Sequence, residues 1–294
     1  PQLPLERFSA TSRVGSRGGM TGLGSRTRGN SSGAAMLRLA GVLGATAVGA
    51  TAPVHHILCL HGGGTNAAIM SLQTAKLRHQ LRDVAEFHYF EGGMATPALD
   101  EAIASRFEPP FYTWYDAAHD GPTGREHYVE SLLDRSVRFQ YVGVDQALDR
   151  LEVHISEAAA RGTPYDAVLG FSQGAVLLTL LTALRLHRGE PPQWRLNVCV
   201  AGMPCRADRF REVCSPEAPP IDFPCVQAHG TEDPFRPWAA KLAGCYVAPD
   251  LIEHPGGHRF PHSKPHARAL GESIRRRLAV TPAPCAPEQE GRPV

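Results

Sequence analysis

Several features are missing from this chain of 294 residues, and each absence excludes a class of protein or site. No apolar run reaches the roughly 18 residues that a membrane-spanning helix needs, so we expect no stable membrane insertion. No cysteine pair has the C-x-x-C spacing that is typical of zinc sites. The chain has neither a phosphate-binding G-K-[ST] loop nor a G-x-G-x-x-G followed by an acid, which excludes the usual nucleotide sites.

An excess of charge of one sign is also missing. The formal net charge is +1, and acidic and basic residues are mixed through the middle of the chain. No broad field therefore favours nucleic acid or an anionic membrane, and we expect a small-molecule partner instead. The sequence gives no indication of an oligomeric state.

The cysteines are odd in number, which argues against a disulfide framework. We expect them to be reduced and mostly buried, as in a protein of the cytoplasm. They are Cys59, Cys199, Cys205, Cys214, Cys225, Cys245 and Cys285.

Both ends of the chain differ in composition from its middle. Residues 1–54 are rich in glycine, serine, threonine and arginine and show no sustained period, so we expect a disordered extension. The alternative is a targeting peptide that opens at Met36 and directs the protein to an organelle. Residues 281–294 contain four prolines and are predicted to form a tail.

Between these ends, short apolar runs alternate with helical periodicity. The predicted strands are residues 56–60, 84–90, 167–169, 196–200, 225–228 and 251–253. The predicted helices are residues 68–81, 144–160, 174–186 and 266–278. This alternation predicts one α/β domain over residues 55–280, with a mainly parallel sheet and helices on both faces.

A G-x-S-x-G sequence, Gly170 to Gly174, lies between a predicted strand and a predicted helix. In that context it is typical of a nucleophile elbow, where glycines permit a sharp turn that exposes the hydroxyl of Ser172. The alternative is a turn of small residues with no chemistry.

A serine nucleophile needs a base and an acid that orients the base. Asp233 follows a predicted strand and is our candidate for the acid, with Glu232 as the alternative. His258 is our candidate for the base rather than His254, because two glycines precede it.

Four histidines in this region recur every four residues, which on a helix would resemble a metal site. They are His254, His258, His262 and His266. The prolines and glycines between them do not support a helix, so we predict no metal ion and no cofactor.

Two further groups of residues complete the predicted site. Backbone N–H groups of Gly63, in an H-G-G-G loop, and of Gln173 are candidates for an oxyanion hole. The long stretch 92–135 is expected to form a lid-like insertion over the site. We expect its Phe111, Tyr112 and Trp114 to line an acyl pocket, although aromatic residues there can also pack the insertion onto the domain.

The combination of motifs resembles the FSH-type serine hydrolases of the α/β-hydrolase superfamily. The motifs are HGGGTN at 61–66, YVGVDQALD at 141–149, GFSQGA at 170–175, HGTED at 229–233 and HPGGH at 254–258. The resemblance covers about residues 55–278 and implies the roles already assigned to Ser172, Asp233 and His258. It also implies activity on esters, with thioesterase-like members that release polyketides. Residues 90–93 depart from the family pattern.

These observations predict a hydrolase that cleaves carboxylic esters through an acyl-serine intermediate. A thioester is the next expected bond. The alternatives are a peptidase or acyl-protein thioesterase, and a hydrolase-like binding protein that does not catalyse a reaction.

Overall fold

The computed structural model describes residues 54–122 and 125–282, without the side chains of residues 125 and 126. The predicted extension before Val54, the tail after Pro282 and Cys285 lie outside the described residues. The other six cysteines are free and buried, which confirms that part of the prediction. Within the described ranges, no helix is both long and apolar enough to cross a membrane.

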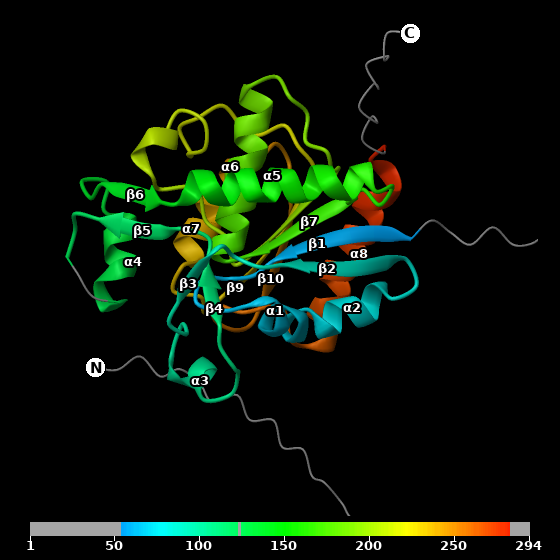
Figure 1. Cartoon of the computed structure of the whole chain (residues 1–294), viewed down its shortest axis with the longest axis horizontal. Coiled ribbons are helices and arrows are strands. Elements are labelled where there is room, and N and C mark those ends of the chain that lie inside the picture. Colours follow the sequence, from blue (N-terminus) through cyan, green and yellow to red (C-terminus); the bar gives the residue numbers. More distant parts are fainter. Residues whose placement is uncertain (1–53, 123–124, 283–294) are drawn as a thin grey trace, which may run out of the picture. The chain divides into compact units, whose positions relative to one another are not determined.

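A six-stranded sheet forms the centre of the fold (Figure 1). Its strands are β1 (His55–Leu60), β2 (Ala85–Phe90), β7 (Ala167–Phe171), β8 (Leu196–Val200), β9 (Cys225–Gly230) and β10 (Asp250–His254). Their spatial order is β10-β9-β8-β7-β1-β2, and all neighbours run parallel. The carboxyl ends of all six strands therefore meet at one edge, where loops from distant parts of the sequence come together.

Helices cover both faces of this sheet. One face packs against α1 (Ala67–Gln73), α2 (Ala75–Leu81) and α8 (Lys264–Val280). The other packs against α5 (Val144–Ala160), α6 (Gln173–His187) and α7 (Arg236–Gly244). Alternation along each strand separates the two cores, so that Leu58 and Leu60 belong to one and Ile57 and Cys59 to the other.

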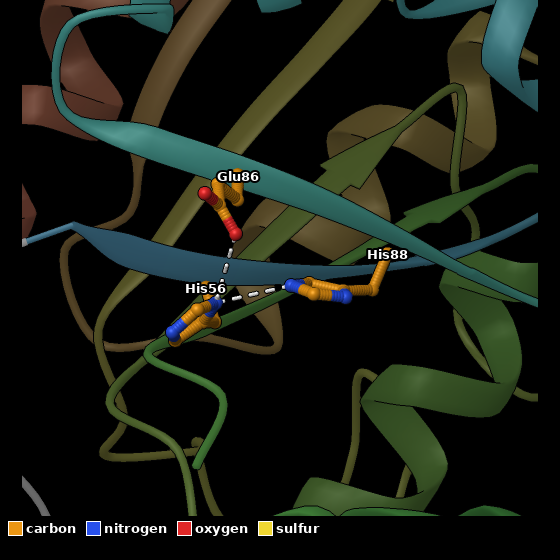
Figure 2. A group of neighbouring side chains, drawn as sticks. All are labelled: His56, Glu86 and His88. Atoms are coloured by element: carbon orange, nitrogen blue, oxygen red, sulfur yellow. Dashed lines mark hydrogen bonds and ion pairs between the residues drawn. The ribbon is translucent and has the colours of Figure 1, made fainter. Parts of the chain in front are cut away.

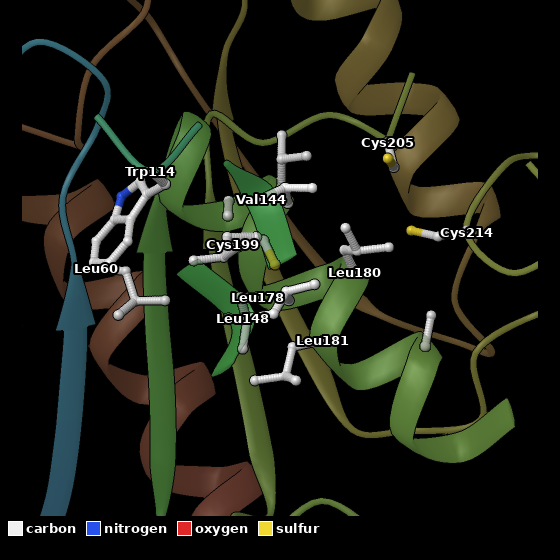
Figure 3. Packing of buried hydrophobic residues seen from close by; sticks show 14 of the residues in the cluster. Leu60, Trp114, Val144, Leu148, Leu178, Leu180, Leu181, Cys199, Cys205 and Cys214 are labelled. Atoms are coloured by element: carbon white, nitrogen blue, oxygen red, sulfur yellow. The ribbon is translucent and has the colours of Figure 1, made fainter. Parts of the chain in front are cut away.

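The α5–α6 layer shows why these helices form. The buried residues of α5 are the predicted apolar face, namely Val144, Ala147, Leu148, Leu151, Ile155 and Ala158. In α6, every residue from Gly174 to Ala183 is buried, because this helix lies between the sheet and its neighbours. Figure 3 shows Leu148 of α5 and Leu178 of α6 in the same cluster as Trp114. That cluster also contains Ala175 and Val176, which directly follow the predicted elbow.

The prediction of one helix over residues 68–81 is wrong in one respect. The structure divides it into α1 and α2 at Thr74. The Thr74 hydroxyl donates to the Met70 carbonyl over 2.9 Å and contacts the Tyr89 hydroxyl at 2.8 Å. Because Thr74 bonds both its own helix and the neighbouring strand β2, it fixes the break between α1 and α2. The periodicity of the sequence does not show this break.

The predicted insertion has its own secondary structure. It contains β3 (Met94–Thr96), α3 (Glu101–Ala104), β4 (Phe111–Thr113), β5 (Asp116–His119) and α4 (Arg125–Leu133). Strand β4 pairs antiparallel with β3, and β5 pairs antiparallel with β6 (Phe139–Val142). The structured segment thus continues past residue 135, because β5 needs β6 as its partner. Neither β6 nor α7 was among the predicted elements.

Candidate active site

Ser172 occupies the single residue between β7 and α6. Its backbone angles are φ 50° and ψ −115°, which a non-glycine residue rarely adopts and which store roughly 1–3 kcal/mol of strain. Both motif glycines are required by close contacts. A Cβ added at Gly170 would lie 2.5 Å from backbone atoms of Gly174. One added at Gly174 would lie 2.5 Å from the Leu60 carbonyl oxygen. The tight turn therefore holds Ser172 at the carboxyl edge of the sheet.

The structure brings the three predicted triad residues into a continuous hydrogen-bonded series. His258 Nε2 lies 2.8 Å from Ser172 Oγ, and His258 Nδ1 lies 2.8 Å from Asp233 Oδ2. The Asp233 side chain is 2 % exposed, whereas that of His258 is 22 % exposed. The alternative acid, Glu232, is exposed to solvent. A buried acid, an accessible imidazole and a hydroxyl in line are the arrangement that activates a serine.

Backbone contacts hold the acid loop and the base loop together. The Thr231 N–H donates to the His254 carbonyl over 2.9 Å, and the Glu232 N–H donates to the Gly256 carbonyl over 3.0 Å. Gly256 has φ +138°, a conformation that favours glycine. His254, the alternative base, is itself 2 % exposed, and burial lowers its pKa. His258, the histidine that two glycines precede, is therefore the one that reaches the serine.

The H-G-G-G loop lies against the elbow. An added Cβ at Gly62 would lie 3.5 Å from Ser172 Cβ, and one at Gly63 would lie 3.2 Å from Gln173 Oε1. Among the described residues, neither the Gly63 N–H nor the Gln173 N–H has a hydrogen-bond partner. Two free donors, one in the glycine loop that contacts the elbow and one in the residue after the serine, are suited to an oxyanion.

Comparison with known proteins decides the family of this chain. The model of the family described as Serine hydrolase (FSH1) matches residues 51–270. The chain belongs to this family. The resemblance seen in the sequence and the expectation of a serine hydrolase are thereby confirmed.

Curated relatives of this serine hydrolase cover most of its length. The chain is 30% identical over 218 residues to "Esterase FPY3" of Fusarium mangiferae, a match that covers 70% of this chain and 88% of the relative. It is 24% identical over 238 residues to "Esterase OVCA2" of Danio rerio, with 75% and 96% covered.

Solved structures show the same fold. The carboxylesterase from Mesorhizobium loti has a TM-score of 0.50 and 19% identity, over 75% of this chain and 88% of that one. SOBER1 of Arabidopsis thaliana also has a TM-score of 0.50, with 18% identity over 76% and 99% of the two chains. The α/β-hydrolase fold is confirmed.

His61 fixes the glycine loop of this serine hydrolase from within. Its side chain is fully buried, its Nδ1 lies 2.7 Å from the Gly62 carbonyl oxygen, and its Nε2 accepts the Gly92 N–H over 2.9 Å. Nδ1 therefore carries the proton of a neutral imidazole. Burial lowers the pKa of His61 to about 4, which agrees with the neutral form. Glu91 Oε2 is 3.8 Å from Nε2, but a neutral ring makes no ion pair with it.

The Gln173 side chain joins the elbow to the insertion. Its Oε1 accepts from the Thr113 hydroxyl over 2.6 Å and from the Trp114 N–H over 2.8 Å, and its Nε2 donates to the Tyr115 carbonyl over 2.8 Å. The motif residue after the serine thus has a second task, which a five-residue pattern does not reveal.

The three predicted pocket residues lie in different environments. Trp114 is 0% exposed and its Nε1 donates to the His61 carbonyl over 2.7 Å, so it supports the glycine loop from behind. The expectation that Trp114 lines an acyl pocket needs correction, because a fully buried ring has no surface to offer. Phe111 is 6% exposed, and Tyr112 is half-buried with backbone bonds to Gly64 and Thr65.

Two aromatic residues near the base were missed by the sequence reasoning. The ring of Phe235 lies 5.0 Å from that of His258, and the ring of Tyr128 in α4 lies 6.5 Å from Phe235. Phe235 also donates its N–H to Asp233 Oδ1 over 2.8 Å. The sequence signal that could have identified Phe235 is its position two residues after Asp233, the candidate acid.

Proposed function

We propose that Ser172, His258 and Asp233 are the catalytic triad of a serine hydrolase that cleaves carboxylic esters through an acyl-serine intermediate. One observation carries this proposal: the two 2.8 Å hydrogen bonds that join Asp233 to His258 and His258 to Ser172. The family supplies the reaction class, and the esterase names of the curated relatives support an ester as the substrate.

The reaction follows from this geometry. His258 Nε2 accepts the Ser172 proton while Oγ attacks the carbonyl carbon of the ester. Asp233 holds the ring through Nδ1 and stabilises the imidazolium that forms. His258 then returns the proton to the departing alcohol, and water repeats the cycle on the acyl-serine. No step requires a metal ion or a cofactor.

The oxyanion of each tetrahedral intermediate needs donors that are already in place. We assign this role to the backbone N–H groups of Gly63 and Gln173, which have no other partner among the described residues. One such donor is worth about 3–4 kcal/mol in the transition state of comparable enzymes.

The test of the triad is labelling with a fluorophosphonate, which reacts with activated serines. The parent chain, Ser172→Ala and Ser136→Ala are treated alike, and the modified residue is located by mass spectrometry. Ser136 is a matched control because it is an exposed serine whose hydroxyl bonds Asp134. We expect labelling at Ser172 in the parent and in the control variant, and none in Ser172→Ala. A folded parent chain that resists the probe would contradict the triad and favour a binding protein.

The kind of bond is tested separately with matched substrates. Aryl esters and thioesters of the same acyl chain are compared, together with an acylated peptide. A higher kcat/KM for the ester supports the proposal. A higher value for the thioester would correct the bond while leaving the triad intact, and preference for the peptide would favour an acyl-protein thioesterase.

A further inference from the structure

A second cluster of side chains lies on β1 and β2, away from the triad. The parallel register places His56 beside Glu86 and Leu58 beside His88. Because side chains alternate along a strand, His56, Glu86 and His88 all project from the same face of the sheet. Figure 2 shows the two rings and the carboxylate directed toward one another.

The distances within this cluster are those of potential metal ligands. His56 Nδ1 lies 3.0 Å from His88 Nε2 and 3.9 Å from Glu86 Oε2, and all three atoms lie within 4.8 Å of one another. Tetrahedral zinc with bonds of about 2.0–2.2 Å places neighbouring ligand atoms roughly 3.3–3.5 Å apart. The rings need to separate slightly and the carboxylate to approach. Glu86 is 64 % exposed, so its side chain has room to do so.

In contrast to the sequence-based prediction of no metal ion, we propose that His56, Glu86 and His88 bind a divalent transition-metal ion of the zinc class. Two imidazoles and one carboxylate are a donor set that suits zinc, and three protein ligands leave a fourth position for water. Magnesium and calcium prefer oxygen ligands alone, so this cluster discriminates against them.

Proton positions are compatible with such binding. In the hydrogen bond between the two rings, one of the facing nitrogens carries a proton. When both neutral rings carry their protons on the outer nitrogens, His56 Nε2 and His88 Nδ1, both facing nitrogens present lone pairs. One ring changes its tautomer and no net proton is released.

The surroundings hold one ligand in position. The ring of Tyr165 packs edge-on against His88 with 5.5 Å between centroids, and the Tyr165 hydroxyl is fixed by His154 Nε2 at 2.9 Å. A ring that is already oriented loses little freedom when it binds a metal.

The position of the cluster predicts what a bound ion does. His56 is near the start of β1, roughly 13 Å along the strand from its carboxyl end, where the candidate active site begins. Among the described residues, β2 is an edge strand of the sheet and pairs only with β1. A bound ion would tie this edge to its neighbour and raise the thermal stability of the domain. The inference is independent of the proposed hydrolase reaction.

The first test measures zinc binding to the whole chain after chelator treatment and desalting. Titration with zinc chloride is followed by calorimetry for the parent, His56→Ala, His88→Ala and His187→Ala. His187 is an exposed histidine at the end of α6 and serves as the control. We expect one equivalent to bind in the parent and the control, with affinity at least tenfold lower in the other two variants. Equal affinity in parent and His88→Ala would overturn the proposal.

A second measurement needs no variant and guards against loss of folding. Nickel is added in small portions to the parent chain, and the ring signals of its histidines are followed by NMR. We expect the signals of His56 and His88 to broaden first. Broadening that begins at His258 or another histidine, or no broadening at all, would contradict the site.

Discussion

The three loops that carry the triad and the insertion at residues 92–135 are organised in opposite ways. The triad loops, at residues 170–174, 229–233 and 254–258, are short, and their shapes follow from local backbone constraints. An added Cβ at Gly170 or Gly174 would lie 2.5 Å from backbone atoms, and the other two loops are joined by backbone hydrogen bonds. The insertion contains one small antiparallel sheet, β3-β4, a strand, β5, that pairs with β6 beyond residue 135, and two short helices. The Gln173 side chain attaches it to the elbow.

This difference separates chemistry from support. Residues whose positions are fixed by backbone geometry carry the reacting groups. The insertion supports them from outside: Trp114 donates to the glycine loop, and the Gln173 side chain bonds the insertion to the elbow. Substitutions in the triad loops should therefore remove turnover. Substitutions at the junction, where the Gln173 side chain bonds Trp114 and Tyr115, should lower turnover in part. Substitutions inside the insertion should change substrate preference.

The largest effect is expected from Asp233→Asn. The amide preserves the shape of the side chain but no longer stabilises a charged His258, so kcat for an aryl ester should fall by about 10⁴-fold. Glu232→Gln is the matched control, because this neighbouring acid is exposed, and its kcat should stay near the parent value. A larger loss in the control than in Asp233→Asn would assign the acid to Glu232.

The next effect concerns His61, which connects the glycine loop to the insertion. Its pKa is about 4 in the folded protein, against about 6.5 in an unfolded chain. The unfolded state therefore binds more protons between these values, so the free energy of unfolding should decrease as the pH falls from 6.5 towards 4. The pH-dependent part of the free energy of unfolding that comes from His61 is roughly 3 kcal/mol. It is fully present above pH 6.5 and is lost as the pH falls towards 4.

The measurement is urea unfolding at several pH values for the parent and His61→Gln. Burial also lowers the pKa of other histidines, so part of the dependence will remain in the variant; these are His88, His154, His254 and His262. The variant should show a shallower slope than the parent. Parallel slopes would mean that His61 is not held neutral by the fold.

A smaller effect is expected at the junction itself. In Gln173→Glu the carboxylate can still accept from the Trp114 N–H but cannot donate to the Tyr115 carbonyl, and it adds negative charge beside the developing oxyanion. We expect kcat to fall on the order of 10²-fold. Gln193→Glu, at a surface glutamine that bonds Ser156, should leave kcat unchanged and is the control. Equal kcat values in the two variants would show that the junction does not influence the chemistry.

The same contrast explains what the sequence revealed about the site. Ser172, Asp233 and His258 were found because each follows a strand and lies within two residues of a glycine or proline, which are local signals. The role of the Gln173 side chain was not visible, because its partners are about 60 positions away in the chain. Trp114 was misjudged because an aromatic residue near a site serves equally well as wall or as support.

The fold shows the same limit. All six strands of the central sheet and the buried face of α5 were predicted, since apolar runs and helical periodicity are recorded in neighbouring residues. The break at Thr74 depends partly on a contact with Tyr89, and β6 exists as a strand because β5 is its partner. Elements that depend on distant contacts are beyond a reading of local pattern.

The smallest expected effect tests whether the insertion sets substrate preference. Tyr128 of α4 contacts Phe235, which packs on the ring of His258, so Tyr128→Leu should loosen the apolar surface beside the base. We expect kcat/KM for long-chain esters to change up to about tenfold relative to short-chain esters. Leu133→Ala, at an exposed residue of the same helix, is the control and should keep the parent profile. An unchanged profile in Tyr128→Leu would confine the insertion to a supporting role, because the contact of Tyr128 with Phe235 would then have no influence on the acyl chain.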